Sequence, residues 1–102
     1  MRTSGIRCRP RVLTLDYLDR EAELRSVAGQ REPARAAVKK LGVTWRLVRP
    51  RVVAAGGANT ARSYDAHVSA MTRLARGAAL TTLEREAARG LELVDELERV
   101  FG

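Results

Sequence analysis

Apolar residues recur at intervals of three and four along most of this chain of 102 residues, the spacing that places side chains on one face of an α-helix. Gly29, Gly42, the Gly run at Gly56 and Gly77 interrupt this pattern, and each is expected to end a helix. The pattern predicts helical segments over residues 15–28, 34–41, 44–55 and 63–76, and a last segment that starts at Thr81. We therefore expect an all-α protein of about five helices.

The segment 34–49, ARAAVKKLGVTWRLVR, has the pattern of two short helices joined by a tight turn at Gly42. Gly42 suits the left-handed position after the first helix, and Thr44 suits the N-cap of the second. Apolar side chains define the inner faces of the two helices: Ala34, Ala37, Val38 and Leu41 on the first, then Val48, Val52 and Ala55 on the second. Trp45, Arg46 and Arg49 project to the opposite side of the second helix.

The tetrapeptide Leu41-Gly42-Val43-Thr44, with Val48 four residues after Thr44, resembles the turn of the helix-turn-helix in bacterial and phage DNA-binding proteins. In that family the second helix enters the major groove, and side chains near its start contact base edges. The resemblance implies double-stranded DNA as the partner and four candidate base contacts: Thr44, Trp45, Arg46 and Arg49. The chain departs from the family pattern at three positions, namely Val38, Pro50 and Arg51. An ordinary helical hairpin with a solvated basic face is the alternative interpretation of the same residues.

Positive charge is concentrated in two places in this chain, whose formal net charge is +7. Residues 1–11 contain four Arg and no acid, and residues 31–51 contain seven basic residues against Glu32. A phosphate-binding surface requires such segregation. We expect residues 1–11 to be a flexible basic arm, and we predict phosphate contacts from both segments: Arg7, Arg9, Arg11, Arg35, Lys39 and Lys40. A GC-rich coding sequence, which favours Arg over Lys, is a second source of the high Arg content.

The helical segment at 63–76 has an apolar side, which His67 borders, and a polar side. The apolar side comprises Tyr64, Val68, Met71 and Ala75, and the polar side comprises Arg62, Ser69, Arg73 and Arg76. This basic stripe either holds phosphates or is a solvated helical face.

The last helix starts with the capping-box spacing of Thr81 and Glu84 and continues with an apolar track close to a heptad repeat. The track predicts either an oligomerisation surface or a face that docks on the preceding helix: Leu83, Ala87, Leu91, Val94, Leu97 and Phe101. Gly90 interrupts the track, which favours packing in a bundle over a long coiled coil. The outer face is acidic, so it would be repelled by DNA and is a candidate surface for a protein partner.

These segments divide the chain into four regions. They are a flexible arm at 1–11, a three-helix helix-turn-helix head at 12–55, a Gly hinge at 56–59 and a two-helix tail at 60–102 for packing or oligomerisation. No stretch approaches the ~20 apolar residues of a membrane span, so we expect no membrane partner and a cytoplasmic location. With one His and one Cys, His67 and Cys8, we expect no metal site and no cofactor. No phosphate loop or nucleophile motif supports an enzyme.

Two roles fit a DNA-binding head joined to a helical tail. One is a small transcriptional regulator, which would be dimeric; the other resembles a phage terminase small subunit, which would form a larger ring. A third interpretation is a helical interaction or virion-structural protein that binds no specific DNA sequence.

Overall fold

The computed structural model describes residues 3–102, with side chains described from Arg11 onwards. Within this range the chain forms four helices and no strand: α1 (Thr3–Val27), α2 (Arg31–Ala54), α3 (Ala58–Ala75) and α4 (Leu80–Val100). The all-α prediction is confirmed, and the expected count of about five helices is corrected to four. None of the described helices is long and apolar enough to cross a membrane.

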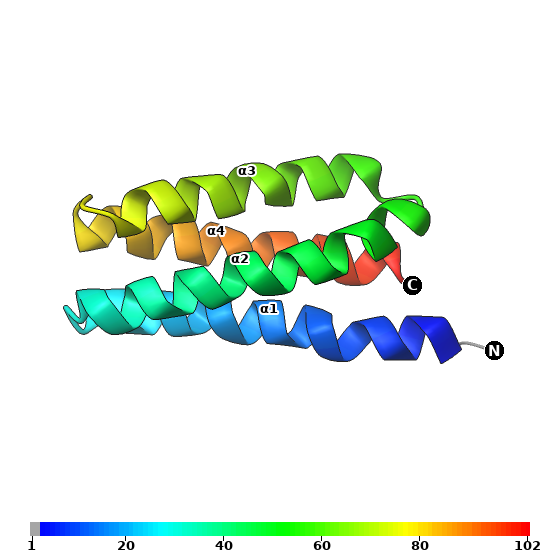
Figure 1. Cartoon of the computed structure of the whole chain (residues 1–102), viewed down its shortest axis with the longest axis horizontal. Helices are drawn as coiled ribbons and strands as arrows, with labels where there is room; N and C mark the ends of the chain where they lie inside the picture. Colours follow the sequence, from blue (N-terminus) through cyan, green and yellow to red (C-terminus); the bar gives the residue numbers. More distant parts are fainter. Residues whose placement is uncertain (1–2) are drawn as a thin grey trace.

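The four helices form an antiparallel bundle in which each helix runs back alongside the one before it (Figure 1). Helix α1 packs against α2 and α4, and α3 packs against the same two helices from the other side. The bundle measures 44 × 21 × 19 Å. The first turns of α1 extend beyond the end of the bundle where α4 finishes (Figure 1). Because α1 begins at Thr3, most of the segment expected to be a flexible arm is helical.

One hydrophobic core runs through all four helices. Leu, Val and Ala side chains supply most of it, as the low aromatic content requires. Its largest fully buried apolar side chains are Tyr64, Leu15, Leu41, Met71, Leu83 and Leu97. The residues expected to form a separate head and tail therefore share a single core.

Helix α2 is continuous through Gly42, where the sequence predicted a turn. Positive φ angles occur in the described range at Gly29, Gly56 and Gly102 only, so Gly42 has an ordinary helical backbone. Thr44, expected as an N-cap, accordingly lies inside the helix. A helical Gly costs only about 1 kcal/mol relative to Ala, which burial of Leu41 and Trp45 on either side easily offsets.

The turns after α1 and α2 are built around Gly29 and Gly56, both in the left-handed conformation. In each turn two backbone N–H groups bond back to the last carbonyls of the helix. Gly29 N donates to Ser26 O at 3.0 Å and Gln30 N to Arg25 O at 2.8 Å; Gly56 N donates to Val53 O at 3.0 Å and Gly57 N to Val52 O at 2.9 Å. This is the Schellman arrangement, which ends a helix at a Gly. The stops predicted at Gly29 and at the Gly56 run are therefore present.

The inner face of α1 differs from the prediction. From the sequence, a helix over residues 15–28 is expected to turn Tyr17, Leu24, Val27 and Ala28 inward, yet all four are exposed. The buried side chains of α1 are Val12, Leu15, Leu18, Asp19, Ala22 and Ser26. The prediction of this inner face is wrong because the observed inner face includes two polar residues, Asp19 and Ser26, which interrupt its apolar pattern.

Candidate nucleic-acid interface

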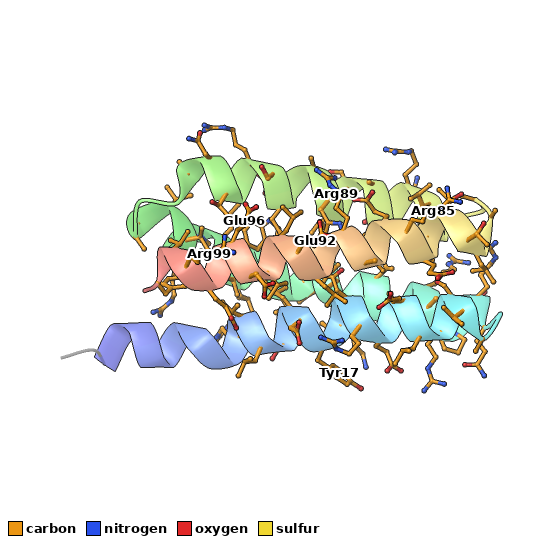
Figure 2. The ribbon with its side chains drawn as sticks, turned by 180° about the vertical axis from the view of Figure 1, so that it is seen from behind. Tyr17, Arg85, Arg89, Glu92, Glu96 and Arg99 are labelled. Atoms are coloured by element: carbon orange, nitrogen blue, oxygen red, sulfur yellow. The ribbon has the colours of Figure 1, made fainter. Side chains whose placement is uncertain are left out.

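Charge is distributed unequally between the two sides of the bundle. Helix α2 carries seven basic residues and one acid, whereas α4 carries three basic residues and six acids. Helix α3 lies beside α2 and has a further basic residue, Arg76, directly after it. Figure 2 shows the opposite side of the bundle, where Glu92 and Glu96 lie among Arg side chains along α4. The bundle thus has a basic α2–α3 side and a more acidic α4 side.

A groove of about 400 Å³ runs between α2 and α3 on the basic side. Arg35, Lys39 and Arg46 line it from α2, and Arg76 closes it from the end of α3. All four cationic side chains are exposed. The α2 residues share one face because they follow the helical repeat, with Gly42 between Lys39 and Arg46. We call this groove, with its four lining cations, the basic groove.

Gly42 helps to keep the basic groove open. A Cβ at this position would lie 3.8 Å from the Val68 side chain, and the absence of any larger group leaves space between the cations. The one acid in the groove lining, Glu32, lies 3.5 Å from the Arg35 guanidinium and partly neutralises that end. Lys39, Arg46 and Arg76 remain available to a bound anion. An extended polyanion fits this chemistry because several cations face one channel.

Trp45 and Arg49 are both held by Asp65 on α3. The indole Nε1 of Trp45 donates to Asp65 Oδ1 at 2.7 Å, and Arg49 Nη2 lies 2.8 Å from Asp65 Oδ2. The hydrogen bond from Arg49 has the largest effect and lowers the pKa of Asp65. Burial opposes it, and the hydrogen bond from Trp45 and the charge of Arg49 lower the pKa of Asp65 further. The hydrogen bond to Asp65 and the negative charge of Asp65 in turn raise the pKa of Arg49. This cluster ties α2 to α3 beside the basic groove.

The four predicted base contacts do not share a surface. Trp45 is buried, so its predicted outward orientation is wrong, and Arg49 is bonded to Asp65. Thr44 faces a different groove, between α1 and α2. Arg46 alone lies in the basic groove. The split follows from the continuity of α2, because one unbroken helix rotates Thr44 and Trp45 away from Arg46.

The predicted phosphate contacts divide in a similar way. Arg35 and Lys39 line the basic groove, whereas Lys40 lines the grooves between α1 and α2. Arg11 is exposed on α1, and the side chains of Arg7 and Arg9 lie outside the described residues. Arg76 was not among the selected contacts. The sequence feature that could have identified Arg76 as a phosphate contact is its position on the basic stripe of the 63–76 segment.

The apolar track of α4 packs within the chain. Leu83, Ala87, Val94 and Leu97 are buried in the core, and Phe101 packs against it partly buried. Leu91 is partly exposed. Most residues of the track therefore dock on neighbouring helices of the same chain, which is one of the two roles considered for it.

A buried polar network, which sequence reasoning missed, connects α1, α3 and α4. His67 lies between two carboxylates, with Nε2 2.8 Å from Asp19 Oδ1 and Nδ1 2.9 Å from Glu86 Oε2. The hydroxyl of Tyr64 donates to Asp19 Oδ2 at 2.6 Å. Asp19, Tyr64 and His67 are fully buried, while Glu86 retains slight exposure and lies 3.3 Å from Arg89. Every polar side chain in the network therefore has a partner.

The network favours a charged His67. Burial alone would lower the pKa of the imidazole, but the hydrogen bonds and charges of Asp19 and Glu86 together raise it. Burial and the Asp19 charge likewise raise the pKa of Tyr64 well above its usual value. Among the described side chains, no group of three or more His, Cys, Asp or Glu is arranged to hold a metal ion. The arrangement has the chemistry of a structural ion-pair cluster.

Comparisons of the chain with protein-family models, with curated proteins and with solved structures found no match. Inferences about function therefore rest on the geometry described above.

Proposed function

We propose that this protein binds the phosphate backbone of double-stranded DNA through the basic groove. The observation that carries this proposal is the convergence of Arg35, Lys39, Arg46 and Arg76 on one channel between α2 and α3. Cations that neutralise DNA phosphates release condensed counterions, which supplies most of the free energy of non-specific binding. The acidic α4 side then faces away from the duplex.

Backbone binding requires no separate recognition helix. Phosphate contacts fix the position of a protein on DNA, whereas base-edge contacts supply sequence specificity. Since Arg46 is the one candidate base contact that lines the groove, the arrangement supports binding with little dependence on sequence. Among the roles predicted from the sequence, this favours a DNA-packaging or virion-structural protein over a regulator of a single site.

The proposal is tested by fluorescence anisotropy with two labelled duplexes of unrelated sequence across a salt series. We expect similar affinities for both duplexes and a logarithmic salt slope of roughly −3, at about −0.9 for each of the three groove cations that Glu32 does not neutralise. No binding at low salt contradicts the proposal. Strong preference for one sequence instead supports the base-reading interpretation.

A further inference from the structure

The basic groove has an apolar surface between its cations. Besides the four cations and Glu32, its lining consists of five residues with small or apolar side chains: Ala36, Val38, Gly42, Thr72 and Ala75. We call these five residues the groove floor. The four cations are exposed, whereas Val38 and Ala75 are buried. A bound strand therefore meets charge at the edges of the groove and an apolar surface at its bottom.

The groove floor offers little to a hydroxyl group. Thr72 has the one polar side-chain atom of the floor, and this hydroxyl donates to Val68 O at 2.9 Å within α3. Gly42 lies inside α2, where backbone N–H and C=O groups bond to one another along the helix. Glu32 lies in the first turn of α2, beside Arg35, and so at one end of the groove. Polar groups along the floor are thus already bonded within their own helices.

The spacing of the cations places the sugars of a bound strand over this floor. Arg35 and Arg46 are eleven positions apart on α2, a distance of about 16 Å at a rise of about 1.5 Å per residue. That distance corresponds to about five nucleotides of one strand, at about 3.4 Å each along the duplex axis. When several phosphates of one strand contact the cations, the sugars that connect those phosphates face the groove floor.

We propose that the basic groove binds one strand of the duplex with its sugars against the groove floor, and that it thereby selects deoxyribose over ribose. Because this selection requires DNA binding in the groove, it rests on the proposed function. The 2′-hydroxyl is the group by which a protein distinguishes RNA from DNA at a given site. A hydroxyl that loses water at the floor without gaining a partner weakens the binding of RNA.

Gly42 allows the floor to be changed while the four cations stay in place. A Cβ at this position makes an ordinary contact with Val68 at 3.8 Å, and the backbone is helical. Gly42→Ala adds a methyl group to the floor. Gly42→Ser adds the same carbon and a hydroxyl, whose oxygen can accept a hydrogen bond from a 2′-hydroxyl. The two variants are therefore nearly matched in size and differ in one polar atom.

Fluorescence anisotropy with DNA and RNA duplexes of the same sequence, at the same salt concentration, tests the selection. We expect the wild-type chain to bind the DNA duplex more tightly by about fivefold or more. Gly42→Ala should keep this preference, whereas Gly42→Ser should reduce it by about threefold relative to Gly42→Ala. The two duplexes also differ in shape, but that difference is the same for both variants. The comparison of Ala with Ser therefore isolates the hydroxyl.

Circular dichroism verifies that both variants keep the helical content of the parent chain. Equal affinity of the wild-type chain for the two duplexes, or a preference for RNA, overturns the selection of deoxyribose and leaves the proposed function in place. The same ratio of DNA to RNA affinity in Gly42→Ala and Gly42→Ser also overturns it. Binding of neither duplex at low salt overturns the proposed function and the selection together.

Discussion

Gly90 on α4 lies directly against the imidazole of His67 on α3. A Cβ at Gly90 would overlap His67 Nε2 and approach Asp19 Cγ to 2.6 Å. The absence of a side chain at Gly90 is therefore what allows the His67–Asp19 pair to form inside the bundle. Gly90 interrupts the apolar track of α4, and the space beside it is occupied by His67 of α3 and Asp19 of α1.

Gly90→Ala should lower the free energy of unfolding. Overpacking a filled site costs about 1–3 kcal/mol, which exceeds the 0.5–1 kcal/mol that Ala gains over Gly within a helix. Urea denaturation followed by circular dichroism measures the change. A variant as stable as the parent chain would show that the network is not packed against α4 as described.

Gly42→Ala is the matched substitution and should have the opposite sign. Its Cβ would make an ordinary contact with Val68 at 3.8 Å, and the backbone is helical, so Ala should raise the free energy of unfolding by about 0.5–1 kcal/mol. A left-handed turn at Gly42, as in the helix-turn-helix resemblance, requires Ala to destabilise the chain instead. The sign of the change in urea denaturation separates the two structures.

His67 should titrate above the ordinary histidine value of 6.5, because Asp19 and Glu86 stabilise the charged imidazole. The chain has one His, so its imidazole C–H signals can be followed by NMR without ambiguity. The folded state binds this proton more tightly than the unfolded state. The resulting stabilisation is complete below about pH 6.5 and is lost as the pH rises through the folded-state pKa. A midpoint at or below 6.5 contradicts this account of the network.

Asp65→Asn should strengthen DNA binding. The substitution removes the carboxylate that holds Arg49, while the amide oxygen can still accept the bond from Trp45. Arg49 is then available beside the basic groove, and each added phosphate contact should steepen the logarithmic salt slope by about 0.9. Emission of Trp45, the one Trp in the chain, should change little.

Glu92→Gln is the control for that experiment. It makes the same change of charge on α4, on the side shown in Figure 2. It should leave the salt slope of DNA binding unchanged. Equal strengthening by both variants would mean that net charge, and not the position of Arg49, decides affinity.

The sequence was sufficient to predict much of the core. The helical repeat correctly placed Ala34, Val38 and Leu41 inside on α2, and Tyr64 and Met71 inside on α3. It also located the helix ends at Gly29 and Gly56. These features are local, because three-four spacing and left-handed glycines act within a few residues of the chain.

The remaining features depend on partners far apart in the sequence. Asp19 is stable on the inner face of α1 because His67, 48 residues later, pairs with it. Trp45 turns inward because Asp65 accepts its indole N–H. Gly42 was interpreted as a stop, although an internal Gly is tolerated when its neighbours bury enough apolar surface. The sequence predicted only the α2 part of the basic groove, because the groove also needs Arg76, which lies directly after α3.

The measurement that tests the central claim most directly compares two charge-matched double variants in DNA binding across a salt series. Arg46→Ala/Arg76→Ala removes two cations from the basic groove, and Arg85→Ala/Arg99→Ala removes two from α4 on the opposite side (Figure 2). We predict that the groove variant reduces the magnitude of the salt slope by about 2 and weakens binding, whereas the α4 variant retains the parent slope. Equal loss in both variants, or no loss in the groove variant, would contradict the assignment of the α2–α3 groove as the DNA-binding site.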